Sequence, residues 1–325
     1  MPRGLSWGGR GAARLRLCLA AGALAAALAP ASAAAAEPAL SGSLHAQPLP
    51  VPPGWTEPRV VTECGGAVSI YNTTQPRYDL FLPASDKASG AAVLMLPGGG
   101  LRVLGAGAAS DAEIEAFLAR GIAVMRLEYR TRQVPAQSIP RACQPRPAGA
   151  AAAPPMRFPA LEIVNGNANP ARGDAVLATV LELATADAQA ALRLLHARGA
   201  EWNLDPDRIG AIGESAGGGV AFGALLADAP VETKPDFLIS IFGPSLQDVH
   251  VPEPAPPLFL VTEADHGPVT DGLLAVFSIW KAAGQKVELH VYEVPNFSMT
   301  IDLWGPRLFD WMVERGILVS AGEAP

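Results

Sequence analysis

Residues 211–222 read AIGESAGGGVAF, with a serine set between glycines after an apolar run and ahead of a run of small residues. The apolar run predicts a buried strand, and the small residues from 216 to 227 predict a helix. A strand-to-helix turn that exposes a serine is strained, and side chains beside it would clash. The glycines at 213 and 217 therefore favour a nucleophile elbow presenting Ser215 over a glycine-rich turn in which the serine is incidental.

Outward from this turn, strand and helix patterns alternate along most of the chain. Alternation of this kind predicts an α/β fold, with a mostly parallel central sheet and helices on both faces. Three short alternating runs at 59–64, 67–72 and 77–83 suit an antiparallel edge of that sheet. The expected strands are 91–96, 122–130, 208–214, 237–243, 258–263 and 287–294, and the expected helices are 111–121, 175–202, 216–227, 271–283 and 305–315.

The chain of 325 residues divides into three unequal parts. Residues 1–36 predict a cleaved signal peptide, because four arginines precede the apolar run LCLAAGALAAALA and an Ala-Ser-Ala site follows it. That run is shorter than the ~20 residues a membrane-spanning helix needs. Residues 37–56 form a leader rich in proline and small residues, and 57–320 form one domain interrupted by an irregular insertion at about 132–172. The expected location is the periplasm or the exterior.

The net charge bears on possible binding partners, and the cysteines bear on a possible disulfide. Loss of residues 1–36 moves the net charge from −7 to about −11, because that segment holds four arginines and no acid. No basic run remains to neutralise phosphates, so nucleic acid is excluded as a partner, and no membrane association is expected after cleavage. Cys64 and Cys143 remain; an exported protein could pair them, but their spacing does not decide it.

A second glycine-rich stretch lies after the first buried strand. The run LPGGGL contains Gly99 and Gly100. We expect their backbone N–H groups, together with the N–H of Ala216, to face a developing oxyanion. A dinucleotide-binding loop is a less suitable interpretation of these glycines, since the G-x-G-x-x-G spacing is absent. The alternative is a glycine-rich turn that binds nothing.

With these motifs the chain resembles the α/β-hydrolase fold, and more narrowly its bacterial acetylesterase and xylan-esterase-like branch, a carbohydrate-esterase type. The resemblance covers about residues 65 to 317 without the insertion. It rests on five runs: SGAAVLMLPGGG, ARGIAVMRLEYR, AQAALRLLHARGAEWNLDPDRIGAIGESAGG, PPLFLVTEAD and KAAGQKVELHVYE.

The resemblance implies ester hydrolysis through an acyl-enzyme, often on acylated sugars, without a cofactor or a metal. It implies Ser215 as nucleophile, the loop of Gly99 and Gly100 as oxyanion loop, and Asp265 as the triad acid, with Glu263 as the alternative.

The general base of that family is missing from its usual place. The stretch EVPNFSMTIDLW has Pro295 or Asn296 where the family has histidine, and neither side chain accepts a proton from serine. Of the five histidines, His266 is the one whose loop is expected to border the pocket.

Two functions therefore remain open. One is a serine esterase acting on a small-molecule or carbohydrate ester of short acyl chain, weakened or using a displaced base. The other is a non-catalytic pseudohydrolase that binds a ligand or partner in the former pocket. The sequence does not decide the oligomeric state.

Overall fold

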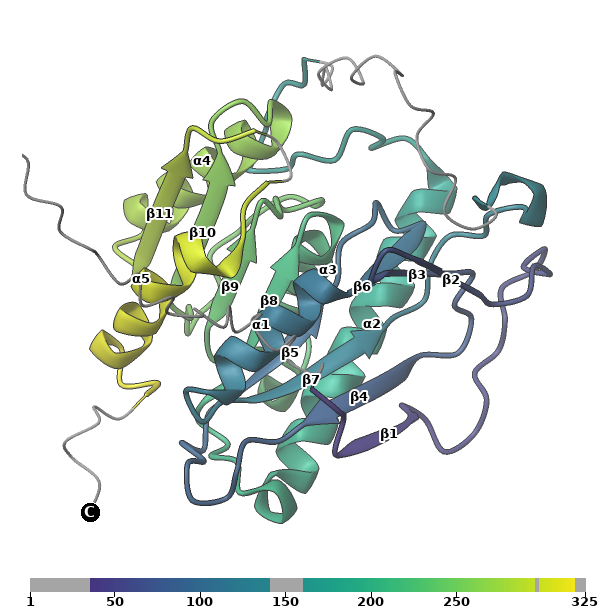
Figure 1. Ribbon diagram of the computed structural model, residues 1–325. Coiled ribbons are helices and arrows are strands. Elements are labelled where there is room, and N and C mark those ends of the chain that lie inside the picture. Colours follow the sequence, from purple (N-terminus) through teal and green to yellow (C-terminus); the bar gives the residue numbers. More distant parts are fainter. Residues whose placement is uncertain (1–35, 141–159, 296–297, 319–325) are drawn as a thin grey trace, which may run out of the picture. The chain divides into compact units, whose positions relative to one another are not determined.

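The computed structural model describes residues 36–140, 160–295 and 298–318, and the expected apolar strands form its larger sheet. Within these residues the sheet has eight strands in the order β1-β4-β7-β5-β8-β9-β10-β11 (Figure 1). The neighbouring strands from β7 to β11 pair parallel, whereas β4 pairs antiparallel with both β7 and β1. This confirms the expected mostly parallel sheet. The strands are β1 (Leu40–Ser43), β4 (Arg77–Phe81), β5 (Ala92–Leu96), β7 (Ala123–Glu128), β8 (Ile209–Glu214), β9 (Leu238–Ile241), β10 (Leu258–Glu263) and β11 (Val287–Tyr292).

A second, three-stranded antiparallel sheet departs from the sequence expectation. It joins β2 (Val60–Cys64), β3 (Ala67–Tyr71) and β6 (Val103–Gly107). Only β4 of the three expected edge strands therefore belongs to the larger sheet. The partner strand β6 reads VLGAG, and its two glycines conceal its strand character in the sequence.

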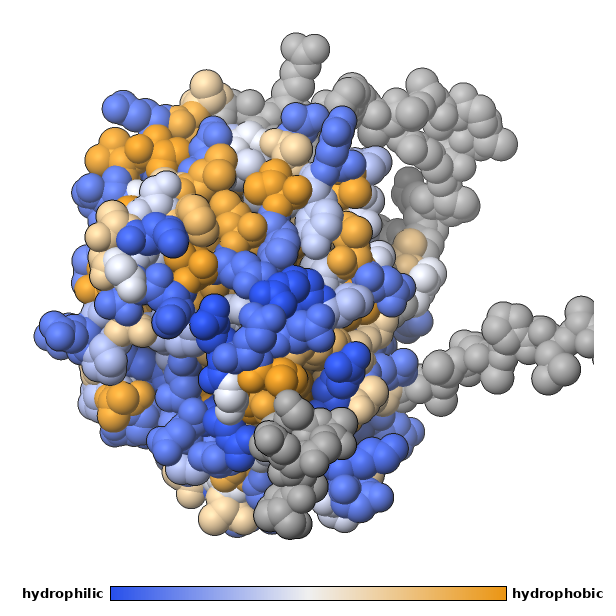
Figure 2. Space-filling model, turned by 90° about the vertical axis from the view of Figure 1, so that its left-hand side faces the viewer, coloured by the Kyte–Doolittle hydropathy of each residue, from blue (hydrophilic) through white to orange (hydrophobic). Residues whose placement is uncertain are grey.

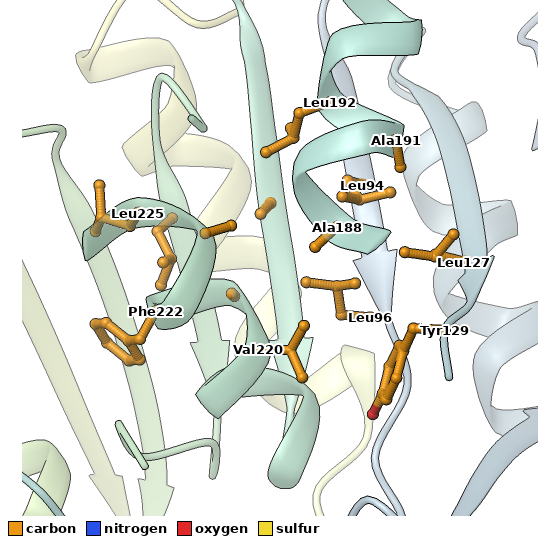
Figure 3. Close-up of a cluster of buried hydrophobic side chains, with 14 of the residues drawn as sticks. Leu94, Leu96, Leu127, Tyr129, Ala188, Ala191, Leu192, Val220, Phe222 and Leu225 are labelled. Carbon is orange, nitrogen blue, oxygen red and sulfur yellow. The ribbon is translucent and has the colours of Figure 1, made fainter. Parts of the chain in front are cut away.

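Helices cover both faces of the larger sheet (Figure 1). Along β5, Leu94 and Leu96 face the core shared with α2, α3 and α4, while Val93 and Met95 face the core shared with α1 and α5. This alternation follows the two-residue period of a strand. Figure 3 shows the first core, where β5 side chains meet those of α2 and α3. The helices are α1 (Ala108–Leu118), α2 (Ala175–Arg198), α3 (Ala216–Leu226), α4 (Pro268–Ala282) and α5 (Ile301–Glu314).

Helix α2 is long and apolar enough, by length and composition, to cross a membrane. It nevertheless lies along the sheet, and its buried face, which includes Ala184, Ala188 and Leu192, belongs to the first core. Buried core helices meet the same criteria as membrane spans, so the packing assigns α2 to the core.

The face on the side of α4, β11 and α5 is a mosaic of polar and apolar side chains (Figure 2). Strand β11 forms an edge of the sheet there, and Val291 on it is 47% exposed. Charged side chains accompany it: Arg307 of α5 donates to Glu288 of β11 at 2.7 and 2.8 Å. Charges on an edge strand oppose pairing with another chain.

Several expected segments fall outside the described residues. Residues 1–35 of the expected signal peptide at 1–36 are outside the described residues. Residues 141–159 of the insertion, which include Cys143, are outside them too. Cys64 is disulfide-bonded, with its partner outside the described residues. Strand β1 lies inside the expected leader and pairs with β4, so part of that leader belongs to the sheet.

Candidate active site

Ser215 occupies a sharp turn between β8 and α3. Its backbone has φ 47° and ψ −123°, a left-handed conformation that side-chain-bearing residues rarely adopt. The turn is held by hydrogen bonds from Ser215 N to Ile241 O at 3.0 Å and from Gly218 N to Ser215 O at 2.9 Å. A serine kept in such a conformation is a mark of functional strain.

The glycine after the serine is required by close packing. A Cβ on Gly217 would lie 2.0 Å from the carbonyl oxygen of Leu96, at the end of β5. No side chain fits at that distance, so the turn can lie directly against β5 only with glycine there. The glycines of the motif GESAG are thus explained by the turn, as expected from the sequence.

The second glycine loop lies against this turn. An ideal Cβ on Gly98 would be 3.1 Å from Ser215 Cβ. Within the described residues, the N–H groups of Gly99 and Gly100 donate no hydrogen bond to a backbone or side-chain acceptor. The N–H of Ala216, first in α3, has no partner within its helix because the first four helical N–H groups lack one. The loop and the helix start therefore bring donors to the vicinity of Ser215.

Strand β6 and residues after β7 hold the glycine loop. Gly105 N of β6 donates to Gly98 O at 3.1 Å, and Arg132 N donates to Leu101 O at 2.7 Å. The buried Tyr129 hydroxyl donates to Pro97 O at 2.6 Å. Burial and the nearby Glu214 carboxylate raise the pKa of Tyr129 above its ordinary value, so the phenol remains a donor.

Two cavities meet at Ser215. The first, the apolar cavity, measures about 340 Å³. The second, the glycine-lined cavity, measures about 540 Å³ and contains Glu214 and Phe242 beside Ser215. The apolar cavity is lined mainly by apolar side chains, namely Leu101, Ala168, Pro170, Leu177, Pro244, Leu246, Pro268 and Val269.

The turn after β10 joins a histidine to a carboxylate. The Nδ1 atom of His266 forms a short hydrogen bond with the Glu263 carboxylate. His266 is 2% exposed and Glu263 is fully buried. Asp265 is exposed, so the carboxylate that contacts this imidazole is the alternative acid rather than the expected one. The turn after β10 brings His266 back to Glu263.

Phe242 links this pair to the cavity. Its ring stacks on the His266 ring, with 5.8 Å between centroids, and it lines the glycine-lined cavity. Phe242 has φ 37°, a second strained residue at the carboxyl end of the sheet. His266 thus lies one aromatic ring away from the cavity that contains Ser215.

The other histidines lie elsewhere. His290 bonds Glu288 at 2.7 Å on β11, and burial lowers the pKa of His196 on α2. His250 is exposed in the loop after β9. Pro295 is exposed, whereas Asn296, the other residue at the family's histidine position, lies outside the described residues.

Sequence reasoning missed four residues around the serine: Tyr129, Phe242, Glu113 and Gly105. Glu113 had a detectable signal, because it stands four residues before Phe117 and so lies on the same face of α1. Tyr129 and Gly105 hold the glycine loop through hydrogen bonds to Pro97 O and Gly98 O. No local sequence pattern indicates these contacts. Across the described ranges, no group of three His, Cys, Asp or Glu side chains is placed to hold a metal ion.

Comparisons with known proteins support the fold. No family model and no curated protein match the chain. The native structure of an esterase from the Planctomycetes species Thermogutta terrifontis is 18% identical, covers 84% of this chain and 97% of its own, and has a TM-score of 0.52. The same esterase phosphorylated by paraoxon is 19% identical over 79% of this chain and 97% of its own, at a TM-score of 0.50. The chain therefore has the α/β-hydrolase fold, with Ser215 on the strand-to-helix turn between β8 and α3.

Proposed function

We propose that the protein is a serine carboxylesterase that acts on short acyl esters, including esters of carbohydrates, with Ser215 as its nucleophile. The observation that carries the proposal is the strained backbone of Ser215 at the meeting point of two cavities. An incidental serine would gain stability from replacement by glycine, which tolerates positive φ. Retention of a hydroxyl in this conformation is a feature of nucleophilic turns.

The surrounding groups supply the other requirements of acyl transfer. Attack of the Ser215 hydroxyl on an ester carbonyl places negative charge on the carbonyl oxygen. The N–H groups of Gly99, Gly100 and Ala216 are the donors suited to stabilise that charge. The apolar cavity, at about 340 Å³, suits a short acyl chain. A neutral ester requires no metal or cofactor for this reaction.

The base proposed for Ser215 is His266, oriented by Glu263. A nucleophile, a base and an orienting carboxylate are the three parts that such a site needs. The bond from His266 Nδ1 to Glu263 selects one tautomer and leaves Nε2 as the proton-accepting atom. In this proposal Nε2 accepts the hydroxyl proton of Ser215, and the Phe242 ring, stacked on the imidazole, holds the plane of that ring.

His266→Ala is expected to slow acylation of Ser215 by about 10²- to 10⁴-fold, the usual contribution of a general base. Paraoxon is a suitable probe because it phosphorylates the structurally similar esterase. Mass spectrometry would follow the phosphorylation of Ser215 with time in both proteins. His250→Ala, which alters an exposed histidine, is the matched control. Equal rates in His266→Ala and the wild type would remove His266 as the base.

A second candidate function is ligand binding without turnover. It is favoured because no hydrogen bond joins the Ser215 hydroxyl to His266 within the described residues, and a base that does not reach the hydroxyl leaves serine a very poor nucleophile. In that case paraoxon would leave Ser215 unmodified in the wild type, and p-nitrophenyl acetate would not be hydrolysed above the buffer rate. Calorimetry with a non-hydrolysable acyl amide would then detect binding to the intact pocket.

Export to the periplasm or the exterior is also proposed. The arginine-flanked apolar segment at 1–36 motivates it, and the disulfide at Cys64 supports an oxidising compartment. In a Gram-negative host, the mature protein is expected in the periplasm, beginning at or near residues 33–36. N-terminal sequencing that finds Met1 intact on cytoplasmic protein would contradict export.

A further inference from the structure

Two carboxyl groups meet behind the serine turn. Glu214 is the last residue of β8, and the two-residue period of the strand places it with Ile212 on the face covered by α1. Glu113 projects from α1 toward the same place and is 8% exposed. Ala109 and Ser110, about one helical turn before Glu113 on α1, line the same cavity as Glu214, and the Glu214 carboxyl acts on Glu113 through its charge and as a hydrogen-bonding group. The residue that precedes Ser215 is thereby joined to α1.

This contact requires a proton. Glu113 Oε2 is completely buried, and no donor among the described residues reaches it. Two ionised carboxylates side by side would repel, and Glu113 Oε2 would remain without a donor. A single proton shared between Glu113 and Glu214 turns the repulsion into a hydrogen bond. Burial, followed by the charge and the hydrogen bond of Glu214, raises the pKa of Glu113 well above its ordinary value.

Among the described residues, no arginine or lysine forms an ion pair with Glu113 or Glu214. Arg126, on β7, is bound to Asp79 at 3.0 Å and to Asp111 at 3.4 Å. Arg307 on α5 is bound to Glu288 and Glu314. Tyr129 is the nearby phenol, and its hydroxyl is committed to Pro97 O. The other titratable groups on α1 and on the elements packed against it are Glu115, Glu128, Asp302, Asp310 and Arg315.

We propose that Glu113 is a positioning residue, whose shared proton with Glu214 ties α1 to the turn that carries Ser215. The proposal rests on the esterase function proposed above. Loss of the proton puts two negative charges in contact beside the turn, because Glu214 adjoins Ser215 in the chain. The expected result is displacement of Ser215 from the donors of the glycine loop. Hydrolysis therefore depends on the protonated pair.

The first test is the pH profile of kcat/KM for p-nitrophenyl acetate. In the wild type, activity should fall by about tenfold per pH unit above the raised pKa of Glu113. Glu113→Gln keeps a donor toward Glu214 but does not ionise, so this fall should disappear while activity at neutral pH stays within about threefold of the wild type. Glu113→Ala, which has no donor, should be impaired at every pH. Glu115→Gln, a half-buried neighbour on α1, is the matched control and should keep the wild-type profile.

The second test does not depend on hydrolysis. A carboxyl whose pKa is higher in the folded than in the unfolded protein stabilises the fold at low pH, and that contribution is lost as pH rises through the folded pKa. The midpoint of urea unfolding should therefore fall with rising pH above about 4.5 more steeply in the wild type than in Glu113→Gln.

The outcomes separate the two proposals. Hydrolysis that is absent in the wild type overturns the esterase function and the positioning role with it, whereas the unfolding data still report the shared proton. Hydrolysis that is present, with an alkaline fall unchanged in Glu113→Gln, overturns the role of Glu113 and leaves the esterase function standing.

Discussion

Ser215→Ala is expected to reduce hydrolysis of p-nitrophenyl acetate by at least about 10³-fold. Removal of a serine nucleophile costs about 10⁶-fold in an efficient serine hydrolase, and the smaller figure allows for a slow wild-type enzyme. Residual catalysis from the oxyanion donors of the glycine loop would remain above water alone. Initial rates at several substrate concentrations measure the loss.

The control is a serine outside the site. Ser278 is exposed on α4 and donates to Leu274 O at 2.9 Å, so Ser278→Ala should hydrolyse the ester at the wild-type rate. Hydrolysis by Ser215→Ala at the wild-type rate would show that the activity does not belong to this site. That result would favour ligand binding without turnover.

A companion substitution measures what the conformation of Ser215 costs in stability. Glycine tolerates positive φ without a steric penalty, so Ser215→Gly should lose activity and yet raise the free energy of unfolding by about 1 kcal/mol. Ser215→Ala keeps the strain and should unfold like the wild type. A gain of stability with loss of activity is the expected cost of a strained active site.

Asp187→Ala is expected to lower the free energy of unfolding by about 3–5 kcal/mol, because it leaves the Arg130 guanidinium buried without its counter-charge. Asp187 is fully buried on α2, and Arg130, 6% exposed, follows β7. The guanidinium donates to the Asp187 carboxylate at 2.7 and 3.0 Å, and Arg130 N adds a bond at 2.9 Å. Urea unfolding followed by circular dichroism measures the change.

An exposed ion pair provides the contrast. Glu201→Ala removes the partner of Arg198, 2.6 Å away at the surface, and should lower the free energy of unfolding far less than Asp187→Ala does. Replacement of both Arg130 and Asp187 by apolar residues should recover much of the loss, because no buried charge then remains unpaired. A loss in Asp187→Ala no larger than that in Glu201→Ala would contradict this account.

The Arg130 and Asp187 pair also bears on the active site. Arg130 lies between Tyr129, which holds Pro97, and Arg132, which holds Leu101. Loss of the ion pair is therefore expected to loosen the glycine loop beside Ser215. Activity in Asp187→Ala should fall even at urea concentrations where the protein remains folded.

The sequence was sufficient to predict the α/β architecture and the turn at Ser215. Apolar runs and helical spacing act through neighbours a few residues apart, so their signal is local. The glycines of GESAG report a backbone conformation that the turn imposes on its own residues, and the structure shows that conformation at Ser215. The arrangement of the small sheet was not predictable, because β6 becomes a strand through its pairing with β3.

The partners of the candidate site were decided partly by a local turn and partly by the tertiary structure. The sequence left Asp265 and Glu263 as alternatives, and the short turn after β10 brought Glu263 to His266. The contact of Glu113 with Glu214 joins a helix and a strand far apart in the chain, and only the packing of α1 on the sheet creates it. Local sequence therefore determined backbone conformation, whereas burial and charge pairing depended on which distant segments the fold brings together, and these set the chemistry around Ser215.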